Sequence, residues 1–297
     1  TTNDTGSETD GDVEIDGGTT NLIVGLSTID GDLVLLSGGT ITDDGIATLT
    51  GTLTATTDAG GSAITLNQLA VTGAFTLAPN GSGDVTIVNA AGLNLAASTM
   101  GGDFSGTATT GDISDSGILA ITGDSTFTAA GGQSVTLNNT NNFTGTVTFA
   151  TPSGNLKNVT VTDTTALDLG TLTLAQVSSA GGNLTVNTGG ALTDSGALVI
   201  PGTTTITATG QVVDLDHTSN NFATILFGSS SNAVSSVEVV DTNAIIIGAS
   251  KSTGNFTVTA GGDVTDGDTV TVGGNLSVVT SASNGLINMG TLEVDGI

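Results

Sequence analysis

The chain has 297 residues and a formal net charge of −26, because 28 Asp and Glu residues are balanced by only two lysines. Binding to nucleic acid or to an anionic membrane surface needs clusters of Lys and Arg, so the charge argues against both classes. No apolar run approaches the roughly 20 residues of a membrane helix. The absence of cysteine excludes disulfides and thiolate metal sites.

The composition predicts strands and turns. Apolar residues make up 37% of the chain, and most other residues are Thr, Gly, Ser, Asn and Asp. β-Branched residues favour the extended backbone of a strand, whereas Gly, Asn and Asp favour turns. Neither a helical hydrophobic period nor a convincing helix start or stop signal is present. We therefore expect an all-β protein.

In chain order, the sequence begins with an acidic segment, residues 1–12, which we expect to be a linker or a cap. A single β domain is expected over residues 13–297. Strand-like runs begin near Val13, Val85, Val159, Leu184, Thr204, Phe222, Val237 and Phe256. From Leu184 onward they recur about every 15–20 residues, with GG, NN, DSG or TSNN between them.

Three sequence markers repeat in the same order along the chain. The first is an apolar run that ends in Asp or Asn, at Asp16, Asn89, Asp163 and Asp241. The second is Gly-Asp or Gly-Asn followed by Leu or Phe, at Gly31, Gly102, Gly182 and Gly254. The third is an acidic turn, at Asp43, Asp115, Asp194 and Asp266. All three recur at intervals of 71–80 residues, which predicts four superrepeats, at 13–85, 86–158, 159–236 and 237–297.

Within the strand-like runs, apolar residues alternate with Thr, as in FTVT from Phe256 to Thr259. A period of two points Val, Ile and Phe inward and Thr outward. A turn of this size cannot bury its own apolar face, so it must stack on its neighbours. The expected fold is a parallel β-solenoid of about 15 coils of roughly 15–20 residues, about four to a superrepeat.

Two further observations bear on this fold. Phe104, Phe143, Phe222 and Phe256 follow turn-like residues and are expected to fill corners of the core. A series of immunoglobulin-like sandwiches is the alternative architecture, but such domains usually contain a core Trp and a corner Tyr. The chain has neither residue.

Two phrases resemble a known group of proteins. They are GGNLTVNTGGALTDSGALVIPGTTTITATG, residues 181–210, and GNFTVTAGGDVTDGDTVTVGGNLSV, residues 254–278. Both are similar to the repeats of filamentous-haemagglutinin-type adhesins and of autotransporter passenger regions. The resemblance is one of style and period, and it extends over nearly the whole chain from Val13. It implies a right-handed parallel β-helix outside the cell, in a protein of adhesion, matrix or fibre building.

Candidate catalytic groups are few. His217 is the only histidine, and although Asp214 and Asp216 are near in sequence, no nucleophile elbow completes a triad. A turn histidine is the favoured interpretation. Paired carboxylates would suit a polysaccharide-acting β-helix enzyme, but such enzymes generally use aromatic platforms and basic residues, and Trp, Tyr and Arg are absent. We expect no enzymatic activity.

Calcium is the candidate ligand of the repeated acids. Ca²⁺ takes about six to eight oxygen ligands, which Asp-rich loops can supply. The candidate ligands are Asp30, Asp32, Asp43, Asp44, Asp266 and Asp268, in two Asp-Gly-Asp turns and one Asp-Asp pair. A further Asp-Gly-Asp turn lies at Asp10–Asp12. The alternative, which we favour because no known calcium-loop spacing is present, is that these acids close turns by binding local backbone amides.

The expected function is structural, as a stalk or a self-assembling fibre subunit of an extracellular bacterial surface protein. The expected partners are copies of the chain joined head-to-tail, together with surface glycans or matrix. The C-terminal TLEVDGI is strand-like and has no polar cap, so we expect either that the chain is an excerpt of a longer one or that its end pairs head-to-tail with the next copy. An adhesin module that recognises a glycan or a partner surface is the alternative.

Overall fold

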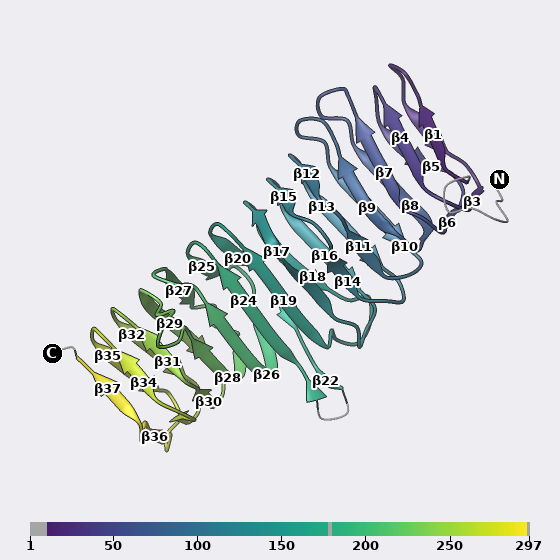
Figure 1. Cartoon of the computed structure of the whole chain (residues 1–297). Helices are drawn as coiled ribbons and strands as arrows, with labels where there is room; N and C mark the ends of the chain where they lie inside the picture. Colours follow the sequence, from purple (N-terminus) through teal and green to yellow (C-terminus); the bar gives the residue numbers. More distant parts are fainter. Residues whose placement is uncertain (1–10, 178–179, 296–297) are drawn as a thin grey trace. The chain divides into compact units, whose positions relative to one another are not determined.

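A computed structural model describes residues 11–177 and 180–295 of the chain (Figure 1). Residues 1–10, most of the expected linker or cap, lie outside the described residues. Every regular element in the described residues is a β-strand, which confirms the all-β prediction. These residues contain no helix long and apolar enough to span a membrane.

The chain divides into two compact units. The first holds Thr1–Gly145 and Thr151–Ser153, and the second holds Thr146–Ala150 and Gly154–Ile297.

The first unit contains strands β1 to β17. Their bounds are β1 (Val13–Asp16), β2 (Leu22–Val24), β3 (Ser27–Ile29), β4 (Leu33–Ser37), β5 (Ile41–Asp43), β6 (Ala47–Leu49), β7 (Leu53–Thr57), β8 (Ile64–Val71), β9 (Ala74–Ala78), β10 (Val85–Asn89), β11 (Leu93–Leu95), β12 (Ser98–Met100), β13 (Phe104–Ala108), β14 (Ile113–Asp115), β15 (Leu119–Ile121), β16 (Ser125–Ala129) and β17 (Val135–Phe143).

The second unit contains strands β18 to β37. Their bounds are β18 (Thr146–Ala150), β19 (Asn158–Asp163), β20 (Leu167–Leu169), β21 (Leu172–Thr173), β22 (Gln176–Val177), β23 (Ala180–Gly181), β24 (Asn183–Thr188), β25 (Leu192–Asp194), β26 (Leu198–Thr207), β27 (Val212–Leu215), β28 (Asn221–Phe227), β29 (Ser236–Asp241), β30 (Ile245–Ile247), β31 (Ser250–Ser252), β32 (Phe256–Ala260), β33 (Val264–Asp266), β34 (Val270–Val272), β35 (Leu276–Thr280), β36 (Ile287–Asn288) and β37 (Leu292–Val294).

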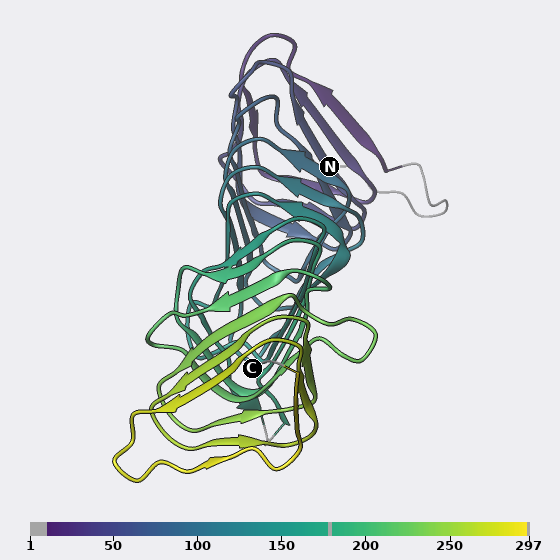
Figure 2. The same cartoon turned by 90° about the vertical axis from the view of Figure 1, so that its left-hand side faces the viewer.

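Each unit is a parallel β-solenoid, as the sequence predicts. In the first unit one sheet contains β1, β4, β7, β9, β11, β14 and β17, and a second contains β2, β5, β8, β10, β13 and β16. Short ladders, β3–β6–β8 and β12–β15–β17, complete the coils. Consecutive coils lie side by side in both views (Figures 1 and 2).

The second unit has the same construction. One sheet contains β19, β24, β26, β28, β30, β33 and β36, and another contains β18, β20, β25, β27, β29, β32 and β35. Its short ladders are β21–β26–β28 and β31–β34–β37. All of these pairings are parallel.

The coils are longer and fewer than the sequence indicated. The shortest coils have 18 residues, as between the bridged residues Leu156 and Leu174. The longest have 26 residues, as between the paired residues Leu172 and Leu198. The described residues form about 13 coils. Because turn residues between strands add to each coil, the strand spacing alone underestimates the coil length.

Each sequence repeat spans about three and a half coils, and not the four that the sequence indicated. In the first unit, Leu33 pairs with Leu53, Leu53 with Phe75, and Phe75 with Leu95, which makes three coils on one sheet. The next copy of the second marker places Phe104 on the other sheet, where it pairs with Val85. Equivalent residues of consecutive repeats therefore lie on different sheets. In the second unit the same shift separates β24 from β32.

The core consists of stacked rows of inward side chains. In β32, Phe256, Val258 and Ala260 are buried and the Thr residues between them are half-buried, which confirms the predicted alternation. Of the four corner phenylalanines named above, none is more than 1% exposed. In the first unit the Phe127 ring lies 5.2 Å from that of Phe104 and 6.0 Å from that of Phe143. Such rows fill the narrow space between the sheets.

The longest coil contains the main irregularity of the second unit. Within it β22 and β23 pair in antiparallel fashion, Gln176 with Gly181. The side chain of Gln176 donates through Nε2 to the carbonyl of Pro201 at 3.2 Å. This excursion is a short two-stranded antiparallel ladder.

We predict that Phe127→Ala destabilises the protein by about 3–5 kcal/mol, because it removes a buried ring that stacks on two others and leaves a cavity. Urea unfolding followed by circular dichroism measures the change. Thr128→Ala, on the outward side of the same strand, is the matched control and should change the free energy of unfolding by less than about 1 kcal/mol. Equal effects of the two substitutions would contradict the stacked core.

Candidate functional site

The second sequence marker forms a hydrogen-bonded joint between consecutive coils, which we call the Gly–Asx corner. In the first repeat, Oδ1 of Asp32 accepts the amide N–H of Thr52, 20 residues later, at 2.6 Å. The carbonyl of Gly31 accepts the amide N–H of Gly51 at 2.9 Å. Two adjacent acceptors of one coil thus hold two adjacent donors of the next.

The same two bonds occur in all four repeats. The side-chain oxygens of Asp103, Asn183 and Asn255 accept the amides of Asp124, Thr203 and Asn275, at 2.8–3.0 Å. The preceding carbonyls of Gly102, Gly182 and Gly254 accept the amides of Gly123, Gly202 and Gly274, at 3.0–3.2 Å. The repeated dipeptide is therefore explained by coil stacking.

The corner needs a second glycine one coil after the marker. A Cβ on Gly123 would lie 2.3 Å from Oδ1 of Asp103 and 2.6 Å from the carbonyl carbon of Gly102. The equivalent contacts to Oδ1 would be 2.2 Å at Gly51, 2.4 Å at Gly202 and 2.7 Å at Gly274. No real Cβ approaches so closely, so only glycine lets the two backbones meet.

The acids of the third marker also bind the next coil. Asp43 accepts the amide of Gln68 through Oδ2 at 2.7 Å. Asp266 accepts the amides of Gly290 and Thr291 at 2.9 and 2.6 Å, and these bonds lower the pKa of its carboxyl group. The sequence favoured turn closure for these residues, and the structure shows that their partners lie in the following coil.

Two of the remaining calcium candidates each accept a single hydrogen bond. Asp30 accepts the hydroxyl of Thr50 at 3.0 Å, and Asp268 accepts the amide of Thr269 at 2.7 Å. Asp44 is exposed on the surface, and Asp10 lies outside the described residues. Within the part of the chain that the structure describes, no three acidic or histidine side chains converge to hold a metal ion. Calcium binding stays a prediction.

The first marker closes turns locally. Asp16, Asp163 and Asp241 each accept an amide two residues ahead, at 2.7 Å, from Gly18, Thr165 and Asn243. Asn89 is fully buried and binds both the amide and the carbonyl of Val71 at 2.9 Å. The three aspartates thus close local turns, and Asp241 also accepts the amide of Phe222, in the preceding coil, through Oδ2.

A buried Asp–Asn pair accompanies the third marker in the middle repeats, and the sequence analysis missed it. Oδ2 of Asp115 accepts from Nδ2 of Asn141 at 2.8 Å, and Oδ1 of Asn141 accepts the amide of Leu119. Asp194 and Asn220 form the same pair at 2.6 Å. The signal was the dipeptide Asn-Asn before Phe143 and again before Phe222.

Asp194 has the most perturbed carboxyl group among these pairs. Burial raises its pKa to about 6, against the opposing effect of hydrogen bonds from Asn220 and from the backbone of His217. The nearby carboxylate of Asp216 raises it further. The His217 ring accepts the amide of Ser219 through Nδ1 at 3.2 Å, so it acts as the turn histidine that the sequence favoured.

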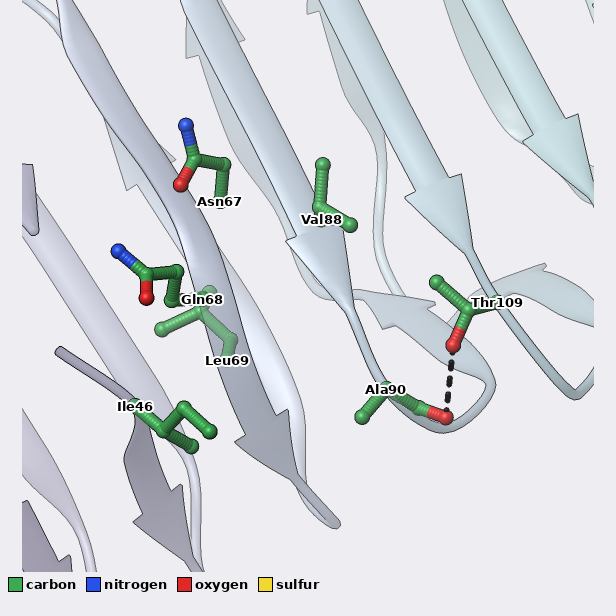
Figure 3. Close-up of a pocket in the computed structure, with 7 residues that line it drawn as sticks. All are labelled: Ile46, Asn67, Gln68, Leu69, Val88, Ala90 and Thr109. Carbon is green, nitrogen blue, oxygen red and sulfur yellow. Dashed lines mark hydrogen bonds between the residues drawn. The ribbon is translucent and has the colours of Figure 1, made fainter.

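Figure 3 shows a notch of about 290 Å³ on the surface of the first unit. It lies where β8 bulges, since Ile87 of β10 faces Leu66 while Asn89 faces Leu69. The lining residues are Ile46, Asn67, Gln68, Leu69, Val88, Ala90 and Thr109. Because none of them titrates or is an activated nucleophile, the notch carries no evident chemistry.

Comparison with known proteins gives one family. The family model described as "Repeats of unknown function (DUF5649)" matches four times, at residues 10–78, 82–150, 156–227 and 234–293. Searches of curated proteins and of solved structures gave no match.

We predict that Gly123→Ala destabilises the first unit by about 2–4 kcal/mol, because the added Cβ overlaps Asp103 and Gly102 and forces the coils apart. Gly60→Ala is the control, since a Cβ at Gly60 meets no atom within 4 Å. Urea unfolding of both variants measures the difference. An unchanged stability of Gly123→Ala would refute the close-contact corner.

We predict that Asp194 makes the protein less stable as the pH rises. Because its pKa is higher in the folded chain, about 6, than the ordinary 3.8, its contribution is fully present below about pH 3.8 and is lost through about pH 6. Asp194→Asn should therefore reduce the fall in unfolding free energy between pH 5 and pH 7.5, by about 1 kcal/mol after allowance for solvent screening.

The readout is the difference between two pH values, so hydrogen bonds lost at both pH values cancel. Asp115→Asn, which alters the equivalent pair in the first unit, is the control for the change of side chain. Burial also raises the pKa of Asp241, so part of the slope should persist. A slope that Asp194→Asn leaves unchanged would contradict the assignment.

Proposed function

We propose that this chain, which belongs to the family of repeats of unknown function, is a structural segment of an extracellular bacterial surface protein. It would serve there as a stalk or as a self-assembling fibre subunit. The Gly–Asx corner is the observation that carries the proposal. Each of the four repeats has the same two backbone-directed bonds to the following coil. A protein that extends by identical joints is suited to providing length.

The extracellular location rests on the sequence. The resemblance to filamentous-haemagglutinin-type adhesins and autotransporter passengers supports it. The net charge of −26 supports a chain that stays dissolved and separate from its copies at its sides.

Head-to-tail association is supported by apolar side chains at both extremes of the described coils. Leu292 and Val294 of β37 are 38% and 40% exposed, while Val270 and Val272, their partners one coil earlier, are fully buried. Ile15 of β1 is 36% exposed, and its partner Leu35 is fully buried. A second copy stacked in the same parallel register would bury both sets, in a heterologous contact that does not close.

The test is electron microscopy and sedimentation of the chain, with and without a calcium chelator. We expect filaments of one width, and Leu292→Asp should abolish them because it places a charge in the end contact. Val279→Asp is the control, since Val279 is 49% exposed but lies on the outward side of β35, opposite Thr259.

Each outcome separates the parts of the proposal. Filaments that dissolve in chelator would assign calcium to the acidic turns. If the chain stays as single particles at every concentration, with or without chelator, it is not a fibre subunit, and the stalk is the part of the proposal that stands. Filaments that Leu292→Asp leaves intact would refute the end contact.

A further inference from the structure

The second unit has a hollow beside the ladder β31–β34–β37, with a mostly apolar surface to which Ser, Thr, Lys and Glu side chains also contribute. Its volume is about 560 Å³, within the range of small-molecule sites. The lining residues are Leu226, Gly228, Ser229, Ser230, Ala249, Ser250, Lys251, Thr269, Thr271 and Glu293. They come from three consecutive coils and from the loop that follows β28, so the hollow is a product of coil stacking and of one inserted turn.

The loop that forms one wall is fixed by its backbone. Gly228 has a positive φ of 67°, and a Cβ on it would lie 2.5 Å from the carbonyl oxygen of Asn232. Ser229 and Asn232 each donate their backbone amide to the carbonyl oxygen of the other, both at 3.2 Å. The amide of Val234 donates to the carbonyl of Lys251 at 3.0 Å. The loop is therefore tied directly to the strand that carries Lys251.

Lys251 is the unexpected member of the lining. The chain has 28 acidic residues and only two lysines, so each lysine is expected to form an ion pair with a carboxylate. Among the described residues, however, the half-buried Lys251 side chain has no ion pair or hydrogen-bond partner. Its three N–H donors are available to a ligand in the hollow.

The opposite side of the hollow supplies an acceptor. Lys251 pairs with Thr271 and Thr271 with Glu293, so the ammonium and the carboxylate stand two strands apart, about 10 Å at the Cα atoms. The Thr271 hydroxyl donates to Oε2 of Glu293 at 3.3 Å, which leaves the other carboxylate oxygen for a ligand. Hydroxyls of Thr and Ser lie between, and Leu226 adds apolar surface.

We propose that this hollow binds a neutral oligosaccharide. A ligand there must offer acceptors to Lys251 and donors to Glu293, and a sugar hydroxyl does both. An anion would satisfy Lys251 but would be repelled by Glu293 and by the net charge of the chain, while a cation would be repelled by Lys251. The aliphatic Leu226 packs against the apolar face of the sugar ring. Recognition of a glycan is a function beyond the structural one proposed above.

Calorimetric titration of the whole chain tests the proposal, with neutral oligosaccharides of glucose, galactose and mannose as probes and oligogalacturonate as the anionic comparison. We expect at least one neutral probe to bind. Lys251→Met should raise its dissociation constant about tenfold, because it removes a charged hydrogen-bond donor. Lys157→Met, which removes the other lysine of the chain, should leave it unchanged.

Glu293→Gln distinguishes the classes of ligand. For a neutral sugar it should weaken binding severalfold, because an amide oxygen is a weaker acceptor than a carboxylate. For an anion it should strengthen binding, because it removes a repulsive charge. The proposal is overturned if no neutral probe binds, if oligogalacturonate binds more tightly than every neutral probe, or if Lys157→Met weakens binding as much as Lys251→Met.

Discussion

The close contact of backbones at the Gly–Asx corners is the constraint on which this structure depends. Parallel strands pair at about 4.8 Å, and the chain can turn at that spacing only where side chains do not intervene. Glycine removes the Cβ at Gly123 and its equivalents. The Asx side chain then supplies an acceptor for an amide that a turning backbone would otherwise leave unpaired. The marker and the glycine 20–21 residues later are therefore parts of one joint.

The half coil in each repeat has a consequence for the surface. Asp32 and Asp103 directly precede strands of different sheets. A side chain that the first repeat places on one side of the unit therefore has its equivalent in the second repeat on a different side. Insertions break this equivalence, as the loop beside Lys251 does in the second unit. Uniform coils thus provide length, and the departures from uniformity provide individual surface sites.

Much of the fold could be predicted from the sequence because its determinants are local. The alternation in FTVT and the glycine-rich turns fix strands and faces, and the markers fix the repeat. The coil number could not be read from them, because a repeat need not contain a whole number of coils. The hydrogen-bond partners of Asp43 and Asp266 could not be predicted either, because they lie about one coil away in the sequence. The Lys251 hollow depends on three coils at once.

The acidic composition is not a requirement of the joints. Repeats three and four use Asn183 and Asn255 where repeats one and two use Asp32 and Asp103, and the bond lengths are alike. A neutral amide therefore serves the corner, and the charge of the aspartates acts elsewhere. Copies that approach side by side bring many exposed carboxylates together, which is unfavourable at moderate ionic strength. Copies that meet at their ends would bury Leu292 and Val294, but they would also bring Glu293 and Asp295 toward Glu14 and Asp16 of β1. The charge therefore opposes both kinds of contact, and only the end contact offsets it by burying apolar side chains.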